Sequence, residues 1–76
     1  GSGSLMVCLE KDIETGIVEE LAKGIAAWHA ELAPAGETTV FFRDSAFADD
    51  VAKSNLTAIL EQVFAGRKKD LRIRSI

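Results

Sequence analysis

The sequence predicts an α/β fold in which three strands alternate with two helices, a βαβαβ domain with a small three-stranded parallel sheet. Apolar runs of strand length occur at 5–9 and 40–42, and an alternating apolar pattern closes the chain at 71–76. Between these runs, apolar residues recur at helical spacing over 18–32 and 51–63. Strand–helix–strand units form right-handed crossovers, so consecutive strands of this chain should run parallel.

The first strand, Leu5 to Leu9, is apolar throughout, which is typical of a strand covered on both faces. Cys8 lies within it and is expected to be a small buried hydrophobe, since a lone cysteine has no disulfide partner in the chain. In the helix that follows, Gly24 costs about 0.8–1.0 kcal/mol relative to alanine. The predicted core stripe of that helix consists of Val18, Leu21, Ile25, Trp28 and Leu32. Pro34 and Gly36 end it.

The central unit runs from Thr38 to Val63 and combines a strand, a polar turn and an amphipathic helix. The apolar run Val40 to Phe42 predicts a strand, and the charged and polar residues from Arg43 to Ser45 end it. Asp49 and Asp50 occupy positions where a helix N-terminus favours acidic side chains. The apolar stripe of this second helix consists of Val51, Ala52, Leu56, Ile59, Leu60 and Val63.

The pattern of the last predicted strand indicates an edge of the sheet, because Leu71 and Ile73 alternate with arginines. Two sheet orders remain open. In the order 2-1-3 the first strand is central and the helices cover opposite faces, whereas in the order 3-2-1 both helices cover one face. The unbroken apolar first strand favours 2-1-3, although the second strand is nearly as apolar.

Composition indicates a folded chain, with 47% hydrophobic and 28% charged residues. No stretch has the run of about 18 apolar residues that a membrane span needs, and no signal-peptide pattern opens the chain, so we expect a cytoplasmic protein with no membrane partner. Residues 1–4 have the composition of a linker or tag remnant. Residues 5–76 then form a single α/β domain that we interpret as a fragment of a larger protein.

Charge is distributed unevenly along the chain. Residues 67–76 hold five basic residues and one acid, whereas residues 1–66 hold four basic residues and eleven acids. An acidic body with a basic end does not predict nucleic-acid binding over the whole surface, but the end can contact phosphates locally. The candidate DNA-contacting residues are Arg67, Lys68, Lys69, Arg72 and Arg74. A charged turn and the wet side of an edge strand explain the same residues.

Acidic residues gather at the predicted carboxyl edge of the sheet, where α/β proteins place ligands. This edge would hold Glu10, Asp12, Asp44, Ser45, Asp49 and Asp50. A small Mg²⁺-dependent phosphoryl-transfer or nuclease-like domain using Glu10, Asp44 and Asp49 is therefore one alternative. Helix caps, turns and dipole partners explain these side chains more simply, so no metal ligand is assigned.

The sequence shows no catalytic pattern: it lacks GxGxxG, GxxxxGK[ST], CxxC, HExxH and GxSxG. His29, the single histidine, has no partner that the sequence identifies, and we expect it at the solvent edge of the first helix. Trp28 is expected in the core or an interface.

The stretch VFFRDSAFADDVAKSNLTAILEQ, residues 40–62, resembles the C-terminal segment of the modification subunit of type III restriction–modification systems. Its most specific parts are FRDSAF, the acidic pair that follows, and Lys53-Ser54-Asn55; the closing Arg74-Ser75-Ile76 is also similar to the family. These proteins are DNA adenine methyltransferases that use S-adenosylmethionine. Their DPPY-type and FxGxG-type motifs are absent here, so the resemblance transfers no catalytic or cofactor-binding residue.

The resemblance implies a non-catalytic C-terminal assembly domain whose parent methylates DNA with S-adenosylmethionine, while this fragment holds no cofactor. Its implied partners are the catalytic domain of the parent, a second copy, the restriction subunit, and DNA through the basic end. The family gives no firm match for VFAGRKKDLRIRSI, residues 63–76, so a DNA-contacting accessory module stays a further alternative.

Overall fold

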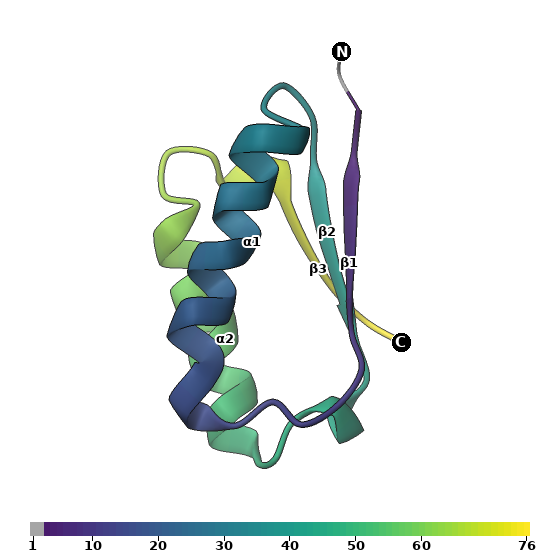
Figure 1. The fold of residues 1–76 in the computed structure, drawn as a ribbon, viewed down its shortest axis with the longest axis vertical. Coiled ribbons are helices and arrows are strands. Elements are labelled where there is room, and N and C mark those ends of the chain that lie inside the picture. The colour runs from purple at the N-terminus through teal and green to yellow at the C-terminus, as the bar shows by residue number, and fades with distance from the viewer. Residues whose placement is uncertain (1–2) are drawn as a thin grey trace.

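The computed structural model describes residues 3–76 and has the predicted order of strands and helices (Figure 1). Its main elements are β1 (Leu5–Leu9), α1 (Val18–Leu32), β2 (Thr38–Phe42), α2 (Asp50–Val63) and β3 (Leu71–Ser75). Three short 3₁₀ turns, η1 (Thr15–Ile17), η2 (Asp44–Ala46) and η3 (Lys68–Asp70), precede α1, α2 and β3. Of the predicted linker at 1–4, residues 1 and 2 lie outside the described part.

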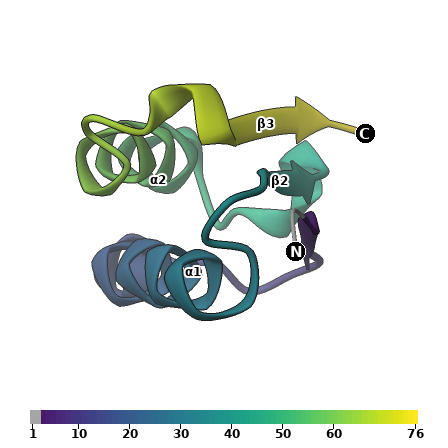
Figure 2. The ribbon, with the colours of Figure 1, turned by 90° about the horizontal axis from the view of Figure 1, so that it is seen from above.

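The three strands form one parallel sheet in the order β1-β2-β3. Val40 at its centre pairs with Val7 of β1 and Ile73 of β3. Both helices lie on the same side of this sheet (Figure 2). The preferred order 2-1-3 is therefore wrong, and the alternative with the second strand in the centre is the one observed.

The side chains of β1 explain why the preference was wrong. Val7 and Leu9 are buried under the helices, but Met6 is 72% exposed and Cys8 is exposed on the opposite face. An unbroken apolar run predicts a strand covered on both faces. In this structure the helices cover only one face of β1, because two successive right-handed crossovers in the same direction place both helices on one side of the sheet. The prediction of a buried Cys8 is wrong for the same reason.

The core lies between the sheet and the two helices. From α1 it takes Val18, Ala22, Ile25 and His29, and from α2 it takes Ala52, Leu56 and Leu60. The stripe predicted for α1 is thus displaced around the helix: Trp28 is 47% and Leu32 62% exposed. Residues 18, 22, 25 and 29 have the same helical spacing as the predicted set, and the small Ala22 permits close approach of the helix.

The start of α2 lies where the sequence predicts it. The side chain of Asp49 accepts a hydrogen bond from the Ala52 N–H at 2.9 Å, which caps the helix. After the helix, Gly66 has φ +83°, a conformation that suits glycine. Within residues 3–76 no helix is both long and apolar enough to cross a membrane.

Candidate interaction face

One face of the sheet carries no helix, and its side chains form the candidate site. Two rows cross the strands in register. The first row is Met6, Thr39 and Arg72, and the second is Cys8, Phe41 and Arg74. Alternation along the strands directs these side chains away from the helices, since the residues between them pack into the core. We call these six residues the uncovered face.

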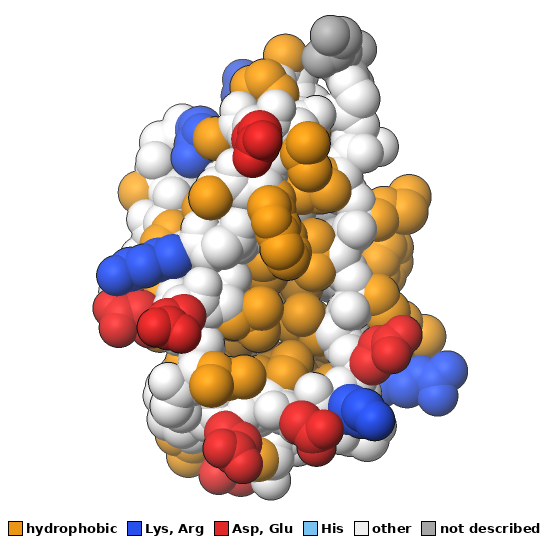
Figure 3. Space-filling model, viewed as in Figure 1, with side chains coloured by type: hydrophobic (Ala, Val, Ile, Leu, Met, Phe, Trp, Pro, Cys, Tyr) orange, Lys and Arg blue, Asp and Glu red, His pale blue; other side chains and the backbone are white. Residues whose placement is uncertain are grey.

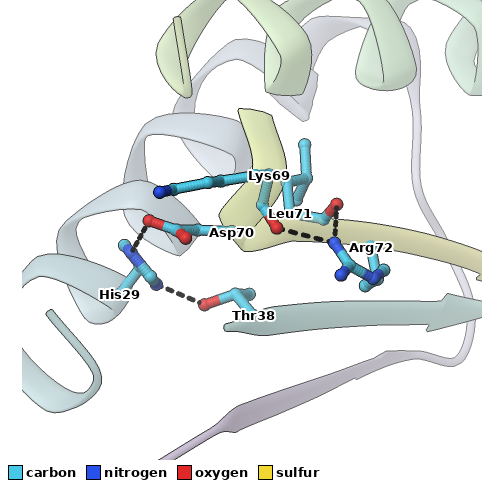
Figure 4. A network of polar contacts seen from close by, with 6 residues as sticks. All are labelled: His29, Thr38, Lys69, Asp70, Leu71 and Arg72. Atoms are coloured by element: carbon cyan, nitrogen blue, oxygen red, sulfur yellow. Dashed lines mark hydrogen bonds and ion pairs between the residues drawn. The ribbon is translucent and has the colours of Figure 1, made fainter. Parts of the chain in front are cut away.

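The two arginines of the uncovered face differ in how they are held. Arg72 is half-buried and donates to the carbonyl oxygens of Lys69 at 2.7 Å and Leu71 at 3.3 Å (Figure 4). Its guanidinium also lies 3.4 Å from a carboxylate oxygen of Glu37. Arg74 is exposed, and in the described part of the chain it forms no ion pair. The uncovered face therefore has an apolar side at β1 and a positive side at β3.

The other predicted DNA-contacting residues do not share this face. Arg67 lies 5.7 Å from the centre of the Phe64 ring, beside the end of α2. Lys68 and Lys69 are exposed in η3, before the strand begins. Only Arg72 and Arg74 of the five predicted residues thus lie together on the sheet.

The acidic residues at the carboxyl edge have separate local roles. Asp44 pairs with Lys53 at 2.7 Å, Asp49 caps α2, and Asp50 begins that helix. Asp12 turns the loop after β1 with φ 61°. No group of three or more His, Cys, Asp or Glu side chains suited to a metal ion occurs within residues 3–76.

A cleft of about 350 Å³ lies at the same edge of the sheet. Its lining residues are Cys8, Leu9, Glu10, Arg43, Ser45 and Ile76. One acidic and one basic residue are among them, and the cleft joins the uncovered face at Cys8. Among the predicted edge residues, Glu10 and Ser45 lie in this cleft, whereas Asp12, Asp49 and Asp50 do not line it.

His29 is fully buried, so the prediction of a histidine at the solvent edge is wrong. Its Nδ1 lies 2.9 Å from Oγ1 of the buried Thr38, and its Nε2 lies 3.8 Å from a carboxylate oxygen of Asp70 (Figure 4). In the Nε2–H tautomer the Thr38 hydroxyl donates to Nδ1. Nε2 faces Asp70 beyond hydrogen-bond distance and has no hydrogen-bond partner among residues 3–76. The spacing of His29 from Ile25 and Ala22 is the sequence signal that identifies it as a core residue.

This polar cluster connects the end of α1 with the start of β2 and with η3. The ring of Phe64 lies 5.2 Å from the imidazole and helps to cover it. A group enclosed in this way cannot reach a substrate from solvent. We therefore interpret His29, Thr38 and Asp70 as a structural cluster and not as catalytic residues.

Comparison with known proteins identifies no family, since no family model, no curated protein and no solved structure gives a significant match to the chain.

Proposed function

We propose that this chain is a non-catalytic assembly domain that docks onto a larger protein through the uncovered face of its sheet. The observation that carries the proposal is the exposed second face of an all-parallel sheet. Parallel sheets occur almost only with both faces covered, whereas antiparallel sheets often leave one face in water. The missing layer is the site where a partner binds.

The chemistry of the uncovered face defines the partner surface. Met6, Cys8 and Phe41 supply apolar contact, and Met6 alone is 72% exposed. Arg74 supplies positive charge on the β3 side. Arg72 adds to this charge, although its guanidinium also contacts Glu37. The partner surface that fits is apolar opposite β1 and β2 and acidic opposite β3.

The resemblance of residues 40–62 to type III modification subunits supports a specific partner, the catalytic domain of such a methyltransferase. On this proposal the parent protein methylates adenine in DNA with S-adenosylmethionine, and the present chain contributes contacts and no chemistry. The lack of methyltransferase motifs in the sequence is consistent with that division of roles.

The test is binding in trans to a type III modification subunit from which the corresponding C-terminal segment has been deleted. We expect a stable complex in size-exclusion chromatography. Phe41→Asp should abolish it, because a carboxylate would face apolar partner atoms. Ser54→Asp, on the exposed side of α2, is the matched control and should bind normally.

Circular dichroism of the two variants separates lost binding from lost folding. A folded Phe41→Asp variant that binds as well as the unaltered chain would contradict the uncovered face as the docking site. Absence of any complex with the unaltered chain would refute the assembly function with this partner.

A second candidate function, contact with single-stranded nucleic acid, is favoured by one feature of the same face. Phe41 pairs in register with Arg74, and Thr39 beside it pairs with Arg72. An aromatic ring flanked by cations on an exposed sheet is a platform on which a base can stack while phosphates meet the arginines. The acidic remainder of the chain limits such contact to this face.

Fluorescence anisotropy with a labelled single-stranded oligonucleotide tests this candidate. Binding should weaken steeply as salt rises, because counterions are released when phosphates are neutralised. Arg74→Glu should remove it, while Lys23→Glu, on the exposed side of α1, should leave it nearly unchanged. Binding that is absent at low salt, or that survives Arg74→Glu, would reject nucleic-acid contact through this face.

A further inference from the structure

The outer edge of β1 is the least protected part of the sheet. Leu5 N–H donates to Glu37 O at 2.8 Å, and the alternation of a parallel ladder then directs the N–H and C=O groups of Met6 and Cys8 away from β2. Within residues 3–76 no strand pairs with this edge. The strand has no charge and no proline, whereas the opposite edge carries arginines, which discourage edge-to-edge pairing.

Helix α1 adds a second apolar surface beside this edge. Leu21, Trp28 and Leu32 are spaced seven and four residues apart, so they lie along one flank of the helix. Trp28 and Leu32 are 47% and 62% exposed. Hydrophobic side chains are visible along α1 and in the hollow between α1 and β1 (Figure 3). We call the edge of Leu5–Leu9 together with this flank the β1–α1 surface.

We propose that the β1–α1 surface binds a second copy of the chain, with the two β1 strands antiparallel across a two-fold axis at Val7. The two three-stranded sheets then join into one continuous sheet with all helices on the same side. Placing the axis at Val7 pairs the whole of both strands. The free N–H and C=O groups of Met6 then meet those of Cys8 in the second copy.

Charge favours this surface over the rest of the chain for contact between two copies. Residues 1–66 hold eleven acids against four basic residues, so two copies repel each other over most of their surfaces. The segment Leu5–Leu9 contains no Asp, Glu, Lys, Arg or His. In the antiparallel arrangement Glu10 lies opposite Ser4 of the second copy, and not opposite another Glu10. A surface that contacts its own copy in this way also closes as a dimer and does not extend into fibres.

This inference goes beyond the proposed function, because it concerns the chain alone and the backbone edge of β1. The uncovered face uses the side chains of Met6 and Cys8 instead. Sedimentation equilibrium of the purified chain should give twice its 8.2 kDa mass. Cys8→Pro should give a folded monomer, since it removes an N–H that points away from β2. Ser75→Pro is the matched control: its N–H points away from β2 at the opposite edge, because Ile76 N–H donates to Phe42 O, and the dimer should persist.

A monomeric mass for the unaltered chain up to millimolar concentration would overturn the proposal, as would a dimer that Cys8→Pro leaves intact. If Cys8→Pro fails to fold, cross-linking provides the second test. Opposed residues of a hydrogen-bonded antiparallel pair have Cα atoms about 5.5 Å apart, within the range of a disulfide. Met6→Cys should therefore cross-link to native Cys8 of the second copy under mild oxidation.

The control for the cross-link combines Met6→Cys with Cys8→Ser. Without the thiol at position 8, the two new thiols are not opposite each other, and no covalent dimer should form. A covalent dimer in the first variant and none in the second supports the axis at Val7. Monomer in both variants, or covalent dimer in both, would reject that arrangement. Dimerisation measured on the chain alone is independent of binding to a methyltransferase, so each proposal can fail without the other.

Discussion

His29 Nδ1 and Thr38 Oγ1 lie 2.9 Å apart with both side chains fully buried. The contact joins the last turn of α1 to the first residue of β2, across the loop that contains Pro34. Because the site is sealed from water, a polar atom that loses its partner there cannot bond to solvent instead. The position of α1 on the sheet therefore depends on one hydrogen bond as well as on apolar packing.

Thr38→Val should destabilise the fold by about 1–3 kcal/mol, because it leaves Nδ1 of the buried imidazole without a partner while preserving the shape of the side chain. Urea unfolding followed by circular dichroism measures the change. Thr39→Val, one residue along and on the uncovered face, is the control and should change stability by less than about 0.5 kcal/mol. Equal effects at the two positions would show that the hydrogen bond contributes nothing specific.

Gly24→Ala should stabilise the protein by about 0.5–1 kcal/mol, since glycine in a helix interior carries an entropic cost that alanine lacks. A Cβ at this position would meet no atom within 4 Å, so the substitution introduces no clash. The expected result is a higher urea midpoint with an unchanged slope.

Gly66→Ala is the contrasting substitution. Gly66 also has open space around it, but its φ of +83° lies in the left-handed region, where a Cβ is strained. Destabilisation of about 1 kcal/mol is expected, as left-handed backbone costs that much for other residues. If both alanine variants shift stability in the same direction, backbone conformation does not control these sites.

Asp49→Ala should cost about 1 kcal/mol, the usual loss when a helix N-cap is removed. The Asp49 carboxylate accepts from Ala52 N–H at 2.9 Å, and alanine removes that acceptor. Asp49→Ser retains an acceptor and should recover most of the stability. Thermal unfolding of the three proteins at one pH makes the comparison, and a serine variant as unstable as the alanine variant would contradict capping.

How far the sequence predicts this structure depends on the kind of pattern involved. The apolar runs, Pro34 and the acidic start of α2 correctly predict the strands and helices, because those signals are local. The predicted core face of α1 is wrong because the predicted apolar stripe and the observed buried residues both contain Val18 and Ile25. Only packing against the sheet selects Ala22 and His29 over Trp28 and Leu32.

The order of the strands depends on contacts that the sequence does not encode locally. β1 and β2 are similarly apolar, so hydrophobicity alone cannot identify the central strand. The uncovered face follows from that order, and for this reason the pairing of Phe41 with Cys8 and Arg74 was not predicted. Arg72 and Arg74 were predicted as candidate contacts from charge alone, without their position beside Phe41.

Leu56→Ala tests the packing of α2 on which this arrangement depends. Leu56 is 2% exposed, and truncating a buried leucine costs about 2–5 kcal/mol through lost apolar burial and the remaining cavity. A domain of this length has a total stability of only about 4–11 kcal/mol, so the variant should lose a large share of it.

Val51→Ala is the matched control on the same helix. Both residues belong to the apolar stripe predicted for α2, but Val51 is 59% exposed. Its truncation should be neutral or slightly stabilising, because alanine favours the helix more than valine does. Urea unfolding of the two variants distinguishes core from surface within a single stripe. A loss at Val51 as large as that at Leu56 would mean that α2 faces the sheet differently, and the assignment of the core would have to change.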